Sequence, residues 1–550
     1  MSQTAPDPAA PDVLIVGAGP VGMVLGCELL QQGVRIRLID RQPTVDESDP
    51  HSKGILVWPR SLELLRRIGV SEQLLARGHR SGKVGYYSDG RLLGSARLDR
   101  HPDSPYPFVL TLPQRETEQV LRARLAELGG VVERGVSLDH LDPDGDRPTA
   151  LLRHPDGRTE TVRPSWLVGA DGPGSTVRGL LGISFDGEPI DVSYAIGDAV
   201  LTGDAPADTA YYYAPDGVVA LVPLRDGAYR IAANIPHRGE DEGDPPRELL
   251  EEIIRRRARI DVTVQEPLWT RSFRPRLGLA GSLRRGRCFL AGDSGHAISP
   301  AGGQGMNVGF QDAANLAWKL AGVVRGRLDE RVLDSYGPER LAGAQRMSAT
   351  SAAQARFAMQ RSPLRRLRRD AVFVAGRLLG VLQRVLVPLL SQTDTNYGQL
   401  DTRPLVLRRQ GLATPGARLP LFAGPALPDG TPALDPYRHS VLLWPGRRTG
   451  HSWTATAARL RERFADSAEV LDLGGLPREA AAKLRRHLGP TPSLALVRPD
   501  GHLAARAPLD RPELLQRELQ ALAPSRSPRR TRRPHRCGGP GLTPGRTCST

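Results

Sequence analysis

Residues 12–40 constrain the fold of this chain more than any other stretch. They read DVLIVGAGPVGMVLGCELLQQGVRIRLID. The apolar run from Val13 to Val16 predicts a buried strand, which is followed by a glycine turn, an apolar helix and a second turn at Gly33. A second strand then ends in the acid Asp40. Because strand, helix and strand follow one another at this spacing, the sequence predicts a βαβ unit and an α/β fold.

The glycine turn of this unit has the spacing of a dinucleotide-binding fingerprint. Gly17 allows the tight turn, Gly19 lets the backbone approach a pyrophosphate, and Gly22 lets the helix lie close to the strand. The helix N-terminus faces the phosphates and stabilises their charge. Asp40 stands where a carboxylate can accept hydrogen bonds from an adenosine ribose. The pattern favours a bound dinucleotide over a bare turn, and it leaves FAD and NAD both open.

Length and cysteine content set the outer bounds. A chain of 550 residues with 39% hydrophobic residues is predicted to form about three domains, at roughly 150 residues each. Cys27 and Cys288 lie in apolar runs and Cys537 and Cys548 in a polar tail, so they offer neither a disulfide framework nor a metal-binding spacing. We expect a cytoplasmic protein without a membrane anchor, because no stretch reaches the ~18 apolar residues of a transmembrane span and the N-terminus lacks a signal-peptide core.

The net charge of +15 is concentrated at one end of the chain. Seven of these charges are arginines in the acid-free tail from Ser525 onward, which leaves eight on the rest. The body is therefore only mildly basic, and we expect no nucleic-acid partner. The tail has too few apolar residues to fold by itself. We interpret it as disordered, with anion binding as the alternative.

Two later motifs repeat the pattern of a strand that ends in a glycine and an acid. Residues 166–183 read WLVGADGPGSTVRGLLGI, a buried strand that runs into Asp171-Gly172 and then a helix with Arg178. Residues 285–324 contain a strand ending in Gly292-Asp293, a loop with His296, and the stretch PAGGQGMN from Pro300. Alone, each could be an ordinary turn. His296 is interpreted as a local hydrogen-bonding residue, with a catalytic role as the alternative.

A helix is predicted to begin near Gln304. Apolar residues follow it with a period of 3.6, at Met306, Phe310, Ala313, Ala314, Ala317, Leu320, Ala321 and Val324. Its first turn is rich in glycine and lacks a Ser, Thr or Asp cap, so backbone N–H groups are left without a partner from the chain. A helix N-terminus stabilises negative charge, which a reduced flavin carries along one edge of its ring.

The three motifs together resemble the FAD-dependent aromatic hydroxylases, the class A flavoprotein monooxygenases. This family includes the phenol hydroxylases and the hydroxylases of aromatic polyketide biosynthesis. The resemblance covers about residues 10–345 and rests on GAGPVG, on the Asp-Gly motif with Arg178, and on Gly-Asp followed by PAGGQGMN. It implies a Rossmann-type FAD-binding domain interleaved with a β-sheet substrate domain.

The resemblance also implies which residues hold FAD. The implied cofactor-binding residues are Gly17, Gly19, Pro20, Val21, Gly22, Asp40, Arg41, Lys53, Gln114, Asp171, Asp293, Gly305, Met306 and Asn307. The implied flavin-edge loop, to which no side-chain acid or base is assigned, is Pro300, Gly302, Gly303 and Gln304. Lys53 departs from the family, which has an arginine there, so we expect a phosphate contact that is held less rigidly. Gln114 could instead be a polar residue before a surface helix.

The family's chemistry implies NADPH or NADH as a transient co-substrate, with O2 and a small aromatic substrate as the other reactants. Hydride reduces the flavin, oxygen adds as a C4a-hydroperoxide, and one oxygen atom passes to a phenolic or polyketide ring in secondary metabolism. Baeyer–Villiger oxygenation on the same scaffold and a non-catalytic flavin-bound binding protein are the alternatives. A monomer or homodimer is expected.

The remaining regions complete the predicted organisation. Residues 217–235 read as a β-hairpin, and alternation sends Tyr212 to one face and Tyr211 and Tyr213 to the other, with one face as a possible pocket wall. Residues 354–390 are predicted to be helical, broken at Pro363 and packed on the FAD domain. The predicted domains are FAD-binding (10–80, 105–180 and 280–390), substrate-binding (81–104 and 181–279), thioredoxin-like without redox cysteines (400–523), and the tail (524–550).

Overall fold

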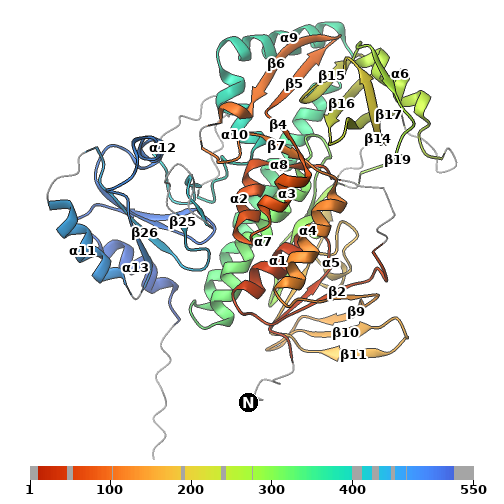
Figure 1. The fold of residues 1–550 in the computed structure, drawn as a ribbon. Helices are drawn as coiled ribbons and strands as arrows, with labels where there is room; N and C mark the ends of the chain where they lie inside the picture. Colours follow the sequence, from red (N-terminus) through yellow and green to blue (C-terminus); the bar gives the residue numbers. More distant parts are fainter. Residues whose placement is uncertain are drawn as a thin grey trace, which may run out of the picture.

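A computed structural model gives the fold of the chain (Figure 1). It describes residues 10–45, 54–101, 103–187, 193–236, 243–275, 277–398, 412–423, 433–447, 452–465 and 467–524. Lys53 and the tail from Ser525 lie outside the described residues, so the predictions made for them are left as they stand.

A six-stranded sheet forms the centre of the dinucleotide-binding region. Its order is β21 (Arg284–Arg285), β22 (Cys288–Leu290), β12 (Trp166–Gly169), β1 (Val13–Val16), β2 (Ile36–Asp40) and β8 (Val132–Arg134). All neighbours are parallel except β21 and β22. The carboxyl ends of β1, β12 and β22 therefore meet at one edge. The predicted βαβ unit is confirmed, and each of the three glycine motifs follows one of these three strands.

Three helices cover this sheet and share its apolar core. They are α1 (Pro20–Gln31), α4 (Gln114–Glu127) and α7 (Gly305–Val324). Helix α1 packs along α7, and the core between them and the sheet contains fully buried residues such as Leu14, Leu25 and Phe310. The helix predicted from Gln304 is confirmed, with Gln304 as its N-cap residue.

An eight-stranded sheet forms the second layer of the molecule. Its strands are β18 (Val262–Val264), β14 (Ser193–Gly203), β17 (Ala228–Ile235), β16 (Gly217–Pro223), β15 (Thr209–Ala214), β5 (Lys83–Ser88) and β6 (Arg91–Arg97), with β19 (Trp269–Phe273) also paired to β14. The predicted hairpin of residues 217–235 is confirmed as β16 and β17. Helix α6 (Arg247–Arg257) packs on the face opposite the cavity described below.

Smaller elements link these two sheets. Sheets of three strands are formed by β3 (Leu56–Val57), β7 (Val109–Thr111) and β4 (His79–Ser81), by β9 (Ser137–Asp142), β10 (Thr149–Arg153) and β11 (Thr159–Val162), and by β13 (Phe185–Asp186), β20 (Gly278–Ala280) and β23 (His296–Ala297). Short helices are α2 (Pro59–Arg67), α3 (Ser71–Arg77) and α5 (Thr176–Leu180), with 3-10 turns at Leu98–Arg100, Gly292–Ser294 and Glu330–Ser335.

The helices after α7 follow a path that differs from the prediction. Helix α8 (Tyr336–Ala358) ends before Pro363, and α9 (Pro363–Leu378) continues into a π-helical turn (Leu382–Leu386) and α10 (Val387–Leu390). The predicted break at Pro363 is confirmed. The expected packing of this segment on the FAD domain is wrong for α9, which lies over β6 of the eight-stranded sheet (Figure 1). Periodicity predicts a helix but carries no information about which partner its inner face meets.

No single helix among the described residues is long and apolar enough to cross a membrane. Only Pro363–Leu378 and Leu382–Leu390 together meet that test, and they are bent by 89°.

The C-terminal region has its own mixed sheet, in the order β27 (Glu469–Asp472), β26 (Ser440–Trp444), β28 (Ser493–Val497) and β29 (Leu503–Ala507). Helices α11 (Ser452–Phe464), α12 (Arg478–Leu488) and α13 (Glu513–Leu522) accompany it, and a short pair joins β24 (Phe422–Ala423) to β25 (Ala433–Leu434). Figure 1 shows this sheet beside α2 and α7.

Candidate active site

The glycine turn after β1 is fixed by close backbone contacts. Gly17 has φ +104°, and a Cβ there would lie 2.4 Å from the carbonyl oxygen of Ala170, which follows β12. At Gly22 a Cβ would lie 2.0 Å from the oxygen of Gly17. These two glycines therefore let the turn, the neighbouring loop and α1 touch one another. Gly22 contacts the turn itself rather than the strand, which sharpens the role predicted for it.

Gly19 has a different environment from its two neighbours in the motif. No atom of the described chain lies within 4 Å of the position of its missing Cβ, and its φ of −72° needs no glycine. Gly19 is also the N-cap residue of α1, where no side chain caps the helix. The open space beside Gly19 thus adjoins an uncapped helix N-terminus, which favours a bound anion.

Asp40 already bonds to the turn that it follows. Its Oδ2 accepts from the Ala18 N–H at 2.8 Å, and its Oδ1 accepts from the Gln42 N–H at 2.9 Å. Each oxygen of Asp40 therefore already accepts one hydrogen bond that holds the turn, although each can accept a further one. Arg41 is exposed beside it.

Asp171 caps a helix. Its Oδ1 accepts from the Ser175 hydroxyl at 2.6 Å and its Oδ2 from the Val177 N–H at 3.1 Å, at the start of α5. Arg178 donates to the carbonyl of Ser294 at 2.8 Å and to that of Pro173 at 2.9 Å. Arg178 therefore joins the second motif to the third. The cavity is lined here by Gly172 and Pro173 rather than by the Asp171 carboxylate.

The third motif is held by a buried carboxylate that the sequence analysis did not single out. Asp312, on α7, accepts from the Gly292 N–H at 2.8 Å, from His296 at 2.5 Å and from Arg340 at 2.6 Å. Burial opposes protonation of His296, but the charge and hydrogen bond of Asp312 outweigh it and raise the pKa of His296. His296 is fully buried and is not part of the cavity wall, so its contacts support the local hydrogen-bonding interpretation.

Asp293, by contrast, is exposed and lines the cavity. Its Oδ1 lies 3.8 Å from where a Cβ of Gly305 would be, so the carboxylate stands beside the first residue of α7.

The loop before α7 is clamped by two side chains. Asn307 accepts from the Trp58 N–H and donates to the carbonyls of Leu56 and Gly303, each at 2.9 Å. The Trp58 indole donates to the carbonyl of Gly302 at 3.2 Å. Gly302 and Gly303 have φ +81° and +60°. The conformation of the loop is therefore set by the chain itself, before any ligand binds.

The glycines of this loop differ in what they leave room for. A Cβ at Gly303 would lie 2.8 Å from the Leu56 side chain, so its bareness admits Leu56 rather than a ligand. At Gly305 the nearest atoms would be 3.8 Å away, and no side chain caps α7. Open space is thus present at Gly305 and not at Gly303.

The side chain of Gln304 points to neighbouring amides. It is buried, donates to the carbonyl of Leu390 at 3.3 Å and accepts from Gln392. Gln114 lines the cavity and accepts from the N–H of Gly54 at 3.1 Å. Gly54 is the residue that follows Lys53 in the sequence.

One cavity of about 950 Å³ connects these loops to the eight-stranded sheet. It is lined by Gly19, Pro20, Val21 and Gln114, by Asp293 and residues 297–306, and by side chains of five strands. Paired residues Arg271, Ile196, Ala232, Ala220 and Tyr211 form a row across β19, β14, β17, β16 and β15. Since alternate residues of a strand share a face, one face of this sheet forms the wall.

The tyrosines of β15 divide between the two faces as predicted. Tyr211 and Tyr213 line the cavity, whereas Tyr212 packs in the core beneath α6. Burial raises the pKa of Tyr211 to about 12, and burial also raises that of Tyr213. Both hydroxyls are therefore neutral at physiological pH and offer no phenolate base.

Positive charge gathers at one end of the wall. Arg230 is buried, pairs with Asp198 at 2.5 Å and lies over the ring of Trp269, whose indole donates to the same carboxylate at 3.0 Å. Arg271 and Arg274 line the cavity beside this group and are exposed. Arginine side chains at this end can pair with an anionic oxygen of a ligand.

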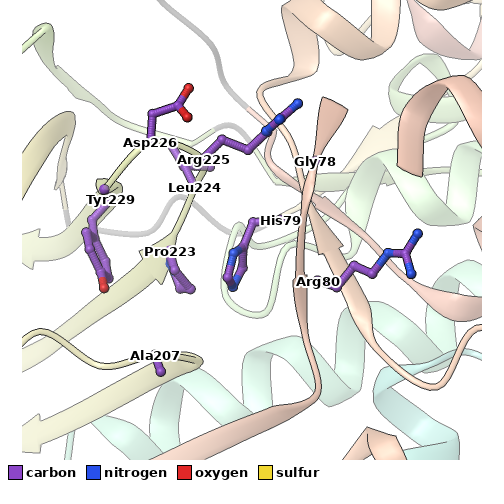
Figure 2. A pocket seen from close by; sticks show the side chains of 10 residues that line it. Gly78, His79, Arg80, Ala207, Pro223, Leu224, Arg225, Asp226 and Tyr229 are labelled. Atoms are coloured by element: carbon purple, nitrogen blue, oxygen red, sulfur yellow. The ribbon is translucent and has the colours of Figure 1, made fainter. Parts of the chain in front are cut away.

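A second, shallower hollow of about 650 Å³ lies between β4 and the turn that joins β16 to β17. Figure 2 shows the ring of His79 toward Pro223, with Arg80 pointing away from it. None of the predicted site residues lines this hollow. The 950 Å³ cavity, which unites the three motifs, is therefore the candidate active site.

Comparisons with known proteins agree with this geometry. A family model described as "FAD binding domain" matches residues 10–351. The 6-methylpretetramide 4-monooxygenase of Streptomyces rimosus is 36% identical over 94% of this chain and 94% of its own. The pentachlorophenol 4-monooxygenase of Sphingobium chlorophenolicum is 31% identical over 93% and 96%. The solved structure of the anhydrotetracycline hydroxylase OxyS from Streptomyces rimosus aligns with a TM-score of 0.70 and 29% identity, covering 93% of this chain and 99% of that one.

The chain belongs to the FAD-dependent aromatic monooxygenases. FAD is the cofactor of this monooxygenase, NAD(P)H is the reductant typical of its family, and its fold is the Rossmann-type domain with a β-sheet substrate layer that the motifs predicted.

Three supporting residues of this monooxygenase escaped the sequence analysis: Trp58, Asp312 and Arg340. Asp312 and Arg340 carried a signal in the sequence, because each is a charged residue on a helix face whose neighbouring positions, four residues away, are apolar. Trp58 carried none, since its contact with Gly302 joins segments 244 residues apart.

Proposed function

We propose that this monooxygenase hydroxylates a polycyclic aromatic substrate of the polyketide or phenolic type. The observation that carries the proposal is the single cavity that joins the flavin-edge loop to an aromatic wall. The row from Arg271 to Tyr211 forms this wall, and Trp269 and Phe273 extend the wall along β19. Flat apolar rings fit such a wall, and the names of the tetracycline-pathway relatives point to substrates of that shape.

The residues present fit FAD. The open space at Gly19, the uncapped N-termini of α1 and α7 and the carboxylate of Asp293 lie along one continuous cavity. In this proposal Gly17, Gly19, Pro20, Val21 and Gly22 hold the pyrophosphate, Asp40 and Arg41 the ribose side, and Asp293 the ribitol. Gln114 and Lys53 flank the phosphates. Gly305, Met306 and Asn307 donate backbone N–H groups toward the flavin edge.

When bound and reduced by NAD(P)H, FAD supplies the activation of O2 for transfer of one oxygen atom to the ring. The chain contributes position and charge. The N-terminus of α7 stabilises negative charge at the flavin edge, with Pro300 beside it. The apolar wall excludes water from the reacting carbon. Arg271, at the charged end, orients a phenolate or enolate oxygen of the substrate.

The proposed organisation follows the predicted domains, with residues 10–80, 105–180 and 280–390 forming the FAD-binding part and residues 81–104 and 181–279 the substrate-binding part, except that α9 belongs with the substrate-binding sheet on which it packs. Asp171 acts by capping α5 and so shaping the loop at Gly172. We further propose a monomer or homodimer in the cytoplasm without a nucleic-acid partner, and a thioredoxin-like C-terminal domain with an interface role.

The test is NAD(P)H oxidation by the FAD-loaded protein with a panel of polycyclic phenols, followed by mass spectrometry of the products. Stimulated oxidation with one added oxygen on an intact ring supports the proposal, whereas opening of a ring beside a ketone indicates Baeyer–Villiger oxygenation. Oxidation that no aromatic compound stimulates indicates a flavin-bound binding protein.

A cavity-filling variant sharpens this test. Ala232 points into the cavity from the centre of the wall. Ala232→Phe should abolish stimulation by the aromatic compound while FAD stays bound, because the new ring occupies the substrate space but not the glycine loops. Equal stimulation in the variant and the wild type would place the substrate elsewhere.

A further inference from the structure

Helix α9 carries its apolar face outward. Five large apolar side chains on it or at its C-terminal cap are between 61% and 76% exposed, namely Leu364, Leu367, Val372, Leu378 and Leu379. Together with Ala371 and Ala375, they give an outward stripe in which apolar residues recur every three or four positions, the spacing of one helix face. A surface helix of a globular protein normally turns such a stripe toward the core.

The inner face of α9 is held by polar contacts and one aromatic ring. Arg366 pairs with Asp89, and Arg369 donates to the Ser88 hydroxyl at 2.7 Å. The Phe373 ring lies 5.1 Å from the ring of Tyr86 on β5. These contacts fix the orientation of the helix over β5 and β6 (Figure 1). These contacts therefore hold the apolar stripe on the outside of the folded protein.

Positive charge lies both beside the stripe and within it, because Arg368 stands four residues from both Leu364 and Val372 and so shares their face. Arg361, Arg365, Arg368 and Arg377 are exposed, whereas the acid of this helix, Asp370, pairs with Arg369. A helix that exposes apolar side chains together with arginines has the chemistry of one that lies in the interface of a membrane and binds anionic lipid headgroups.

We propose that α9 docks this monooxygenase onto an anionic lipid surface. The apolar stripe enters the headgroup and acyl boundary, and the exposed arginines of the helix pair with lipid phosphates. This contact is peripheral. It goes beyond the expectation of a protein without a membrane anchor, which rested on the lack of a transmembrane span and of a signal-peptide core.

A second copy of the chain fits this face less well. A helix of 16 residues is about 24 Å long, so a face about 10 Å wide offers roughly 240 Å², well below the roughly 800 Å² per partner of a stable interface. Pairing two copies along α9 would also bring eight exposed arginines together without an acid between them. Anionic lipid is complementary where a second copy is not.

The position of α9 gives the docking a use. Gln354, Ala358 and Met359, at the end of α8, line the cavity, and α9 begins four residues after Met359. Docking therefore brings that end of the cavity toward the lipid. If the substrate is the apolar aromatic compound of the proposed function, it can enter from the bilayer in which it dissolves.

The experiment is flotation of the FAD-loaded full chain with vesicles of phosphatidylcholine and phosphatidylglycerol in equal parts, compared with phosphatidylcholine alone. We expect binding to the anionic vesicles. Leu367→Ser with Leu378→Ser should weaken that binding about tenfold, and Val131→Ser, at an apolar residue 73% exposed elsewhere, should leave it unchanged. Arg365→Gln with Arg368→Gln should weaken it by a similar factor.

Because the arginine-rich tail is the same in every variant, differences between variants report on α9. Binding that persists in part at about 1 M salt, where the Debye length is about 3 Å, should vanish in the double serine variant. No binding to anionic vesicles, or equal binding by the serine variant, overturns the proposal. So does a wild-type dimer that the serine variant dissociates, since the stripe would then belong to a second copy. The FAD content and NAD(P)H oxidation of each variant report separately on the proposed function.

Discussion

The side-chain amide of Asn307 bonds the backbone of Trp58 and thereby ties the first turn of α7 to strand β3. Its Oδ1 accepts from the Trp58 N–H at 2.9 Å, and its Nδ2 donates to the carbonyl of Leu56 in β3 and to that of Gly303 in the loop before α7. An asparagine fits because donor and acceptor on one side chain replace the ladder bonds that β3 lacks at this edge. The last residue of the motif PAGGQGMN therefore supports the loop through its side chain, whatever its backbone N–H donates to FAD.

Asn307→Ala should destabilise the protein and weaken FAD binding together. The change leaves a buried N–H and two buried carbonyls without partners, at a cost of about 1–3 kcal/mol. Urea unfolding and titration of the apoprotein with FAD, followed by flavin fluorescence, measure the two effects. Gln516→Ala, which removes a solvent-exposed hydrogen bond to Arg463, is the matched control. An Asn307→Ala protein with wild-type stability would contradict the clamp.

Gly19→Ala should weaken FAD binding without destabilising the apoprotein. The new methyl group meets no atom within 4 Å, and the backbone needs no positive φ, so the chain itself tolerates it. The methyl group occupies the space proposed for the pyrophosphate, and we expect at least tenfold weaker binding, equivalent to about 1.4 kcal/mol. Gly179→Ala, at another glycine with open space around it, should change neither quantity. Wild-type FAD affinity of Gly19→Ala would place the phosphates elsewhere.

The pair of His296 and Asp312 should make stability fall as the pH rises above about 6.5. The pKa of His296 is raised from its ordinary value of 6.5, because the carboxylate outweighs the effect of burial. Between 6.5 and the raised pKa the folded protein binds more protons than the unfolded chain, so its stability decreases with pH. The contribution is complete below 6.5 and lost above the folded pKa.

Urea unfolding at a series of pH values checks this slope. His296→Gln keeps a hydrogen-bond donor to Asp312 but does not titrate, so the difference between wild type and variant should shrink as the pH rises. A difference that stays constant from pH 6.5 upward would show that His296 is neutral in the folded protein.

The sequence predicted those parts of the site that depend on local backbone geometry. Gly17, Gly19 and Gly22 specify a turn within six residues. The motifs Asp171-Gly172 and Gly292-Asp293 each follow a buried strand. The alternation of Tyr211, Tyr212 and Tyr213 was equally local. Parallel pairing then brought the three turns to one edge, as the βαβ pattern requires.

Contacts between segments that are far apart in the chain could not be predicted from the sequence. The motif predicts that Asp171 binds the cofactor. In the structure its carboxylate caps α5 instead, because both of its oxygens accept hydrogen bonds there, from the hydroxyl of Ser175 and the N–H of Val177. The outward face of α9 depends on Asp89 and Ser88, some 280 residues earlier. A period of 3.6 identifies a stripe but not the direction in which it points.

The C-terminal region is joined to the FAD-binding region by a buried ion network at the turn between β28 and β29. Arg498 donates to Glu339 of α8 at 2.6 Å and to Asp500 at 2.5 Å, and Lys319 of α7 donates to Glu339 at 2.8 Å. Although burial alone would raise it, the pKa of Glu339 falls to about 2 beside these cations. The network therefore contacts the helix whose first residues line the cavity.

Arg498→Met should separate the unfolding of the two regions. It leaves the carboxylates of Glu339 and Asp500 buried with too little positive charge, at a cost of about 3–5 kcal/mol. We expect two thermal transitions in place of one cooperative transition. Arg461→Met removes an ion pair with Asp472 in which the arginine is 52% exposed, and it should cost at most about 1 kcal/mol. If Arg498→Met unfolds in one transition at the wild-type temperature, the network does not hold the C-terminal region in place, and its contacts with α7 and α8 have no part in stabilising the site.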